Sequence, residues 1–276
     1  MAISDLPIGI FDSGIGGLTV ARHITTLMPQ EKIIYFGDTL HLPYGEKSKK
    51  KIQTFSLEIV NFLIKKKCKA IIIACNSASS LSIDYLTKKF KDQNIILFNV
   101  IDPIINYITK LNSEHQIGVI GTRATIQSGV YEKKIYALKK NHSVVSLETP
   151  LLAPMIEANF YNESIKMKII KSYINDKKLK NIDSLILGCT HYPLIERQIN
   201  NIYHSKVKII NSLKFTTEEV VKKLRKKNLL TTKKKNTKHE FFVSDLTESF
   251  QESAKLFFNK KIILKEKNIF NLNDTT

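Results

Sequence analysis

The chain has 276 residues, of which 43% are hydrophobic, and it can bury a sizeable core in one large or, as we favour, two ordinary domains. No apolar run approaches the roughly 18 residues of a membrane span, and no secretory signal is visible, so we expect a cytoplasmic protein that does not enter a membrane. The net charge of +18 invites a nucleic-acid interpretation, but only four of the 43 basic residues are arginine, so we expect nonspecific binding at most.

A glycine-rich turn follows the first predicted strand, Ile8 to Phe11, and leads into a helical pattern. The turn reads Asp12-Ser13-Gly14-Ile15-Gly16-Gly17. Such a junction offers backbone amides to an anion, but its spacing is that of neither a dinucleotide fingerprint nor a P-loop. Asp12 would repel a phosphate. A carboxylate at this strand end is instead suited to accept a proton or hold an ammonium group.

The second predicted strand, Ile33 to Phe36, ends in a polar loop that contains Asp38, Tyr44 and Gly45. An amphipathic helix is predicted from about Ser48 to Lys66. Strands that alternate with helices indicate a parallel α/β sheet. Ligands bind outside the carboxyl ends of such strands, so we expect these loop residues to lie at a site.

A cysteine ends the third predicted strand, Ala70 to Ala74. Asn76 or Ser77 can cap the helix that follows, which places Cys75 near a helix N-terminus. The partial positive charge there favours a thiolate, so we expect the pKa of Cys75 to be lowered. The alternative is an inert buried cysteine, which is the commoner case.

A second unit is predicted to begin near Asp102. Its first strand, Gln116 to Gly121, ends at Thr122 and resembles the strand that ends before Ser13. Further along, Glu157 lies in an otherwise apolar segment, where a carboxylate is either exposed or functional. Chance similarity between buried strands remains the alternative to an internal duplication.

The construction around Cys75 occurs again around Cys189, in the sequence Ser-Leu-Ile-Leu-Gly-Cys-Thr-His-Tyr-Pro. Sixty-two residues separate Ser13 from Cys75, and 67 separate Thr122 from Cys189. The matched spacing predicts two similar parallel-sheet α/β domains related by pseudo-twofold symmetry, with the active site in the cleft between them. We assign residues 1–100 plus 208–276 to the first domain, which carries Cys75, and residues 101–207 to the second, which carries Cys189.

Two thiols that face each other across a cleft suit a symmetrical reaction. Racemisation needs one base to remove a proton from a carbon and one acid to return a proton to the opposite face. A zinc site is not favoured, because only Cys189 and His191 are close in sequence. A Cys-His nucleophile for acyl transfer stays open, although it leaves Cys75 without a role.

Four motifs in this order resemble the cofactor-independent aspartate/glutamate racemase family, over nearly the whole chain. They are Asp12 to Gly17, Gly37-Asp38 with Pro43-Tyr44-Gly45, Ala74 to Ser79, and Gly188 to Pro193. The Gly-Cys-Thr-His form is similar to the glutamate enzymes, since the related aspartate racemases typically carry glutamate in place of His191.

The resemblance implies that Cys75 and Cys189 are the acid/base catalysts, assisted by Asp12 and His191, and that no metal or other cofactor is used. It implies that the substrates, L-glutamate and D-glutamate, are bound by Asp12, Ser13, Tyr44, Gly45, Asn76, Ser77, Thr190 and His191. Asp38 and Glu157 match further acidic positions near the family's site, and we add Thr122 as the counterpart of Ser13. The resemblance also implies D-glutamate supply for peptidoglycan synthesis and a homodimer.

Overall fold

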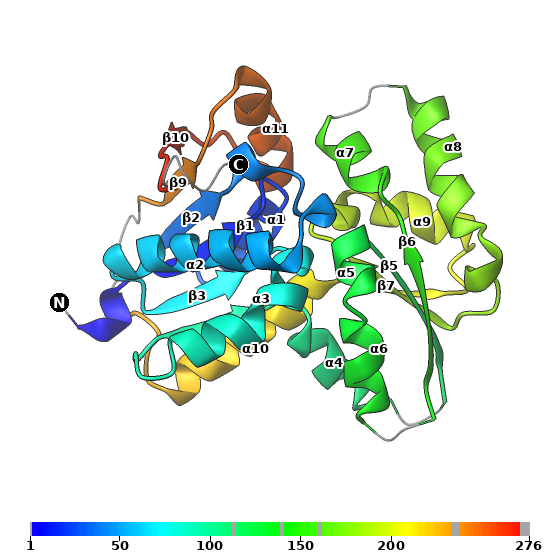
Figure 1. The fold of residues 1–276 in the computed structure, drawn as a ribbon, viewed down its shortest axis with the longest axis horizontal. Coiled ribbons are helices and arrows are strands. Elements are labelled where there is room, and N and C mark those ends of the chain that lie inside the picture. The colour runs from blue at the N-terminus through cyan, green and yellow to red at the C-terminus, as the bar shows by residue number, and fades with distance from the viewer. Residues whose placement is uncertain (1, 112–113, 139–140, 159–161, 233–237, 271–276) are drawn as a thin grey trace.

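The computed structural model describes residues 2–111, 114–138, 141–158, 162–232 and 238–270. The strands form two separate sheets that lie side by side (Figure 1). Every strand pair in both sheets is parallel. The carboxyl ends of the strands, and the loops that follow them, therefore lie at the same edge of each sheet.

The first sheet has six strands in the order β10-β9-β2-β1-β3-β4. These are β1 (Ile8–Asp12), β2 (Ile33–Gly37), β3 (Ala70–Ile73), β4 (Ile96–Asn99), β9 (Glu240–Val243) and β10 (Leu264–Glu266). Successive side chains alternate between two cores, so that Ile8 and Ile10 enter one and Phe11 enters the other. Burial on both faces explains why these strands read as unbroken apolar runs.

Helices cover both faces of this sheet. One core contains residues of α2 (Lys49–Lys65) and α3 (Asn76–Lys89). The other contains residues of α1 (Leu18–Leu27), α10 (Ser212–Lys226) and α11 (Glu248–Phe258). Ser48 begins α2 as predicted, because its side chain accepts a hydrogen bond from the amide of Lys51.

The second sheet has four strands in the order β6-β5-β7-β8. These are β5 (Gln116–Gly121), β6 (Ser143–Glu148), β7 (Ser184–Gly188) and β8 (Lys208–Ile210). One face packs on α4 (Asp102–Ile108) and α6 (Val130–Tyr136), with α5 (Arg123–Gln127) beside them. The opposite face packs on α7 (Leu152–Glu157), α8 (Glu163–Ile174) and α9 (Glu196–Ile202). Short 3₁₀ turns complete the fold: η1 (Ile3–Asp5), η2 (Thr39–His41), η3 (Tyr44–Glu46), η4 (Lys177–Leu179) and η5 (Tyr192–Ile195).

The same strand order occurs in both sheets. In each, the first strand of the unit is central, the second lies on one side of it, and the third and fourth lie on the other. Strands β3 and β7, which precede Cys75 and Cys189, therefore occupy equivalent positions, as do β1 and β5, which precede Ser13 and Thr122. The predicted class, two similar parallel-sheet α/β units, is confirmed.

The boundary expected at residue 208 needs one adjustment. Strand β8 lies on the first-domain side of that boundary, yet it pairs with β7 in the second sheet. A strand belongs to the sheet with which its backbone forms hydrogen bonds. We therefore propose residues 1–100 plus 211–276 as the first domain and 101–210 as the second.

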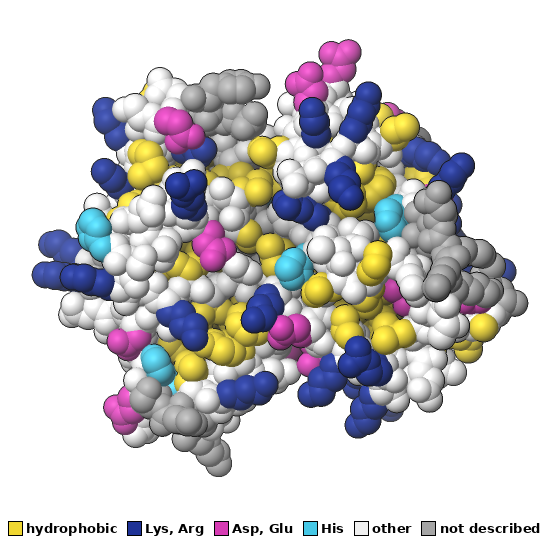
Figure 2. Space-filling model, turned by 180° about the vertical axis from the view of Figure 1, so that it is seen from behind, with side chains coloured by type: hydrophobic (Ala, Val, Ile, Leu, Met, Phe, Trp, Pro, Cys, Tyr) yellow, Lys and Arg dark blue, Asp and Glu magenta, His cyan; other side chains and the backbone are white. Residues whose placement is uncertain are grey.

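The surface agrees with a lysine-rich, solvated exterior. On the face shown in Figure 2, Lys and Arg side chains are scattered, with acidic and apolar side chains between them. Within the described ranges, no helix is long and apolar enough to cross a membrane.

Candidate active site

A small cavity of about 50 Å³ lies between the carboxyl ends of the two sheets. The first unit contributes Ser13, Leu42, Pro43, Tyr44, Gly45, Cys75, Asn76 and Ser77, and the second contributes Thr122, Ala153, Pro154, Glu157, Cys189, Thr190 and His191. The structure thus brings together all the residues that the sequence predicted for the site except Asp12 and Asp38, which lie behind the cavity wall.

Cys75 joins β3 to α3 and forms the N-cap of that helix itself. Its Sγ lies 3.5 Å from the amide nitrogen of Ala78, which donates to it, and 3.5 Å from Oγ of Ser13. The predicted caps, Asn76 and Ser77, are instead the first two helical residues. The helix start therefore holds the sulfur at the edge of the cavity.

The expected fall in the pKa of Cys75 is wrong. Burial of the thiol, and then the nearby carboxylate of Asp12, raise the pKa of Cys75 to about 12. The hydrogen bonds that Cys75 makes with Ser13 and Ala78 act in the opposite direction but are outweighed. Loss of water around a thiolate costs more than one helix N-terminus returns, so the neutral thiol of Cys75 is favoured near neutral pH.

Cys189 follows β7 and has an imidazole beside it. Nδ1 of His191 lies 3.5 Å from Sγ of Cys189, and Nε2 lies 3.6 Å from Oε2 of Glu157. Burial by itself would lower the pKa of His191, but negative charge on Cys189 and Glu157 outweighs it and raises that pKa well above its usual value. Glu157, His191 and Cys189 thus form a line of groups that can exchange protons.

Asp12 lies beneath this line, at the end of β1. Its carboxylate accepts a hydrogen bond from the amide of Gly14 at 3.1 Å, and Oγ1 of Thr190 lies 3.5 Å from its Oδ1. Burial raises the pKa of Asp12, while the charge of His191 acts against that rise. Gly16 passes so close to the site that a Cβ there would stand 2.4 Å from a ring carbon of His191. The glycine turn therefore lets the two units approach.

Asp38 holds the loop that carries Tyr44. Its carboxylate accepts hydrogen bonds from the hydroxyls of Tyr44 (2.7 Å) and Ser244 (2.9 Å), and Nδ1 of His41 lies 2.9 Å away. Asp38 is fully buried and Tyr44 lines the cavity. The structure therefore places Asp38 behind a residue that lines the cavity.

Ser77 and Gly45 of the first unit both contact Thr122 of the second. Oγ of Ser77 lies 2.8 Å from Oγ1 of Thr122. A Cβ at Gly45 would stand 2.8 Å from Cβ of Thr122, so only glycine permits this approach. The sequence reasoning missed the apolar wall formed by Leu42, Pro43, Ala153 and Pro154. Only the first two carried a signal, since they directly precede Tyr44.

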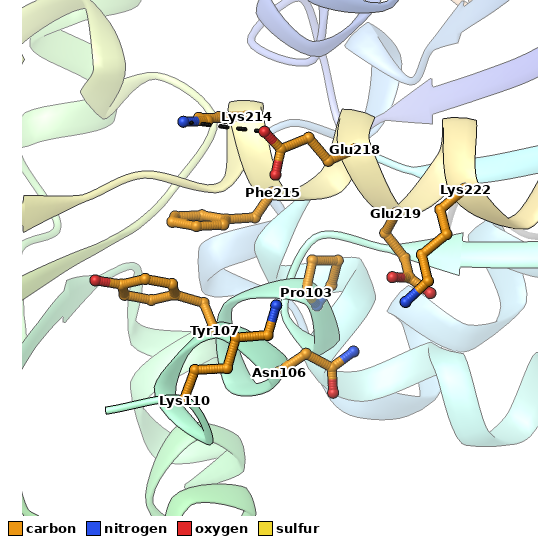
Figure 3. A pocket seen from close by; sticks show the side chains of 9 residues that line it. All are labelled: Pro103, Asn106, Tyr107, Lys110, Lys214, Phe215, Glu218, Glu219 and Lys222. Carbon is orange, nitrogen blue, oxygen red and sulfur yellow. Dashed lines mark ion pairs between the residues drawn. The ribbon is translucent and has the colours of Figure 1, made fainter. Parts of the chain in front are cut away.

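A second groove lies between α4 and α10, with a volume of about 240 Å³ (Figure 3). Tyr107 and Phe215 face each other in it, with ring centres 4.6 Å apart. Its lining contains neither cysteine nor histidine. Proton-transfer groups gather at the first cavity instead. In the portion of the chain that the structure describes, no group of three or more His, Cys, Asp and Glu side chains is arranged to hold a metal ion.

Comparison with known proteins agrees with this geometry. The family model described as Asp/Glu/Hydantoin racemase matches residues 18–220. The chain belongs to this racemase family. A protein of Geobacter metallireducens named glutamate racemase is 36% identical over 255 residues, covering 92% of this chain and 93% of the relative. A protein named glutamate racemase 2, from Caldanaerobacter subterraneus subsp. tengcongensis, is 39% identical over 256 residues, covering 93% and 94%.

Solved racemase structures share the whole fold. The glutamate racemase of Francisella tularensis, solved in complex with D-glutamate, superposes with a TM-score of 0.89 at 36% identity, covering 96% of this chain and 98% of that one. The two-unit architecture with a site between the units is therefore that of the racemase family.

Proposed function

We propose that this racemase interconverts L- and D-glutamate, with Cys75 and Cys189 as the two acid/base groups and with no metal or organic cofactor. The observation that supports the proposal most strongly is positional. The two cysteines follow topologically equivalent strands, β3 and β7, and both line one cavity. A substrate held between them presents one face of its α-carbon to each sulfur.

The chemistry needs one proton to leave and another to arrive. A thiolate removes the α-proton, so that an S–H bond forms while the C–H electron pair stays on the α-carbon as a carbanion. The opposite thiol then delivers its proton to the other face, and its S–H electron pair stays on sulfur. Positioned proton-transfer groups of this kind contribute about 10²–10⁴-fold each to a rate.

The surroundings of the two sulfurs differ. Burial and the carboxylate of Asp12 raise the pKa of Cys75. Cys189 lies against His191, whose pKa is raised well above its usual value. For the enantiomer whose α-hydrogen faces Cys189, Cys189 with His191 beside it removes the proton and Cys75 delivers one, and the roles are exchanged for the other enantiomer. Glu157 assists by holding His191, and Asp12 acts on Cys75.

Glutamate is the substrate that the relatives and the site's chemistry favour. The relatives are named glutamate racemases, and the Francisella enzyme was solved with D-glutamate. Substrate carboxylates have donors at the start of α3, where Asn76 and Ser77 line the cavity, and at Ser13 and Thr190. Tyr44 and Gly45 close one wall, with Thr122 opposite.

The biological role follows from the product. D-Glutamate is a peptidoglycan building block, so we place this activity in the cytoplasm, at an early step of cell-wall synthesis. We also propose that the protein is a homodimer. Light scattering coupled to size-exclusion chromatography checks this, since a molecular mass near 31.6 kDa would identify a monomer.

Circular dichroism of the purified protein tests the function directly. L-Glutamate should lose its signal until equal amounts of the two enantiomers are present, and L-aspartate should change far more slowly. In D₂O, deuterium should appear at the α-carbon of the product enantiomer. A stable covalent adduct with candidate esters, seen by intact mass spectrometry in the absence of racemisation, would favour the Cys-His acyl-transfer reaction instead.

A further inference from the structure

Asn76 leaves one polar atom without a partner at the cavity. The residue is 2% exposed and lines the cavity from the start of α3. Its Nδ2 donates a 2.9 Å hydrogen bond to the hydroxyl oxygen of Tyr131. Its Oδ1 is buried and finds no hydrogen-bond partner among the residues that the structure describes. A buried acceptor left unpaired costs about 1–3 kcal/mol, so it is a place where a ligand donor is stabilising.

Tyr131 reaches Asn76 from the other unit. It lies on α6, is 1% exposed, and packs with Ile135 and Ile186 in the core on one face of the second sheet. A Cβ at Gly188, the residue before Cys189, would stand 3.6 Å from the Tyr131 ring. The tyrosine therefore lies between the two strand ends that carry the cysteines, fixed by the packing of its ring.

The structure orients the side-chain amide of Asn76 with Nδ2 towards the hydroxyl of Tyr131, which accepts the hydrogen bond. The polar atom left free is therefore the acceptor Oδ1. Of the charged groups of glutamate, only the α-ammonium is a hydrogen-bond donor, because both carboxylates are acceptors.

We propose that Tyr131 is a positioning residue for the substrate: it holds Asn76 so that Oδ1 accepts a hydrogen bond from the α-ammonium group of the amino acid. This inference rests on the proposed function, because it needs an amino-acid substrate in the cavity. A second buried acceptor of the cavity lining, Oε1 of Glu157, is also without a partner within the described ranges. The cavity thus contains acceptors that suit a cation as well as donors that suit carboxylates.

The variant Tyr131→Phe tests the inference, because it keeps the ring and removes only the hydroxyl. With the amide no longer held, KM for L-glutamate should rise about five- to tenfold, the range expected for the loss of one hydrogen bond's positioning. Glutarate has both carboxylates but no ammonium group. Its inhibition constant should stay within about twofold of the wild-type value, the scatter of such comparisons.

Tyr192→Phe is the matched control. Tyr192 is also fully buried and also makes a side-chain hydrogen bond, to Thr149 at 2.6 Å, but that bond does not involve Asn76. Thermal unfolding of both variants reports any general loss of packing. Only Tyr131→Phe should raise the KM for glutamate while leaving the inhibition constant of glutarate nearly unchanged.

The outcomes are distinct. An unchanged KM in Tyr131→Phe overturns the inference, and so does an equal weakening of glutamate and glutarate, which would indicate a general opening of the cavity. A wild-type protein that racemises no glutamate rejects the proposed function itself. Racemisation by the wild type together with an unaltered Tyr131→Phe variant rejects only the positioning role.

Discussion

Nδ1 of His191 lies 3.5 Å from Sγ of Cys189, whereas Sγ of Cys75 lies 3.5 Å from a hydroxyl oxygen, that of Ser13. The two cysteines are equivalent in topology but not in electrostatics. Cys189 has an imidazole ring beside it, whereas burial and then the nearby carboxylate of Asp12 raise the pKa of Cys75. The two sulfurs therefore have different partners for proton transfer.

Replacement of either catalytic cysteine by serine should abolish racemisation in both directions. Serine keeps the size of the side chain, but it is a far poorer base near neutral pH. We expect a fall in kcat of at least about 10³-fold for Cys75→Ser and for Cys189→Ser. Cys68→Ser is the control, because Cys68 is also buried but lies beside Gly9 and Leu63 and does not line the cavity. Activity near that of the wild type in either catalytic variant would exclude the two-thiol mechanism.

The stability of the protein should carry a signature of Cys75 at alkaline pH. The folded-state pKa of Cys75, about 12, lies above the ordinary thiol value of 9.0. The unfolded chain therefore loses this proton first, and the stabilising contribution is complete below about pH 9 and disappears as the pH rises towards 12. Urea unfolding at pH 8 to 11 should show a steeper decline for the wild type than for Cys75→Ser. Parallel declines would indicate an ordinary thiol.

His191→Asn should lower kcat/KM about 100-fold, because a positioned proton-transfer partner of Cys189 is lost. L- and D-glutamate have equal free energies, so the fall must be the same in both directions. The two directions should differ instead in the primary deuterium isotope effect, which should grow where Cys189 removes the proton. Equal isotope effects together with an unchanged kcat/KM would show that the 3.5 Å contact has no role in proton transfer.

Asp38→Ala should affect stability as well as substrate binding. It leaves the buried hydroxyls of Tyr44 and Ser244 without their acceptor, at about 1–3 kcal/mol each. The free energy of unfolding should fall by about 2–5 kcal/mol, and KM should rise because Tyr44 is no longer held. A large fall in kcat with unaltered stability and KM would place Asp38 in the chemistry rather than behind it.

Removal of metal ions should leave the activity unchanged. The two thiols suffice as proton carriers in the proposed mechanism, and the carbanion needs no electron sink that the chain would have to bind. Dialysis against a chelator, followed by assays with and without added zinc or pyridoxal phosphate, checks this. Restoration of a lost activity by either addition would contradict the cofactor-independent mechanism.

Local patterns in the sequence were enough to predict the sheets and most of the lining of the cavity. Buried parallel strands read as short apolar runs, and the residues after them must emerge at one edge. Ser13, Cys75, Thr122 and Cys189 each follow such a run, so their convergence could be predicted before any contact was known. Resemblance to the racemase family added the expected roles of Tyr44, Asn76 and His191 towards the substrate, which no periodicity distinguishes.

Such local patterns could not predict contacts between segments that are distant in the sequence. Phe270, far from His41 in the sequence, is buried, and its ring lies edge-on to that of His41 with centres 4.6 Å apart. Strand β8 pairs with β7 in the second sheet, although the sequence assigned it to the first domain. Tyr131 carries no local signal of its link to Asn76, because the two residues are 55 positions apart on different units.

The sequence by itself determined where the two thiols would stand, because strand ends and helix starts are set by neighbouring residues. Only the tertiary structure decided their protonation. A helix N-terminus predicts a lowered pKa for Cys75, but the depth of burial and the distance to Asp12 depend on how two units close over one cavity, and these raise it. Electrostatic energies depend on solvent exclusion and on charges that are remote in sequence, and neither is encoded in a local pattern.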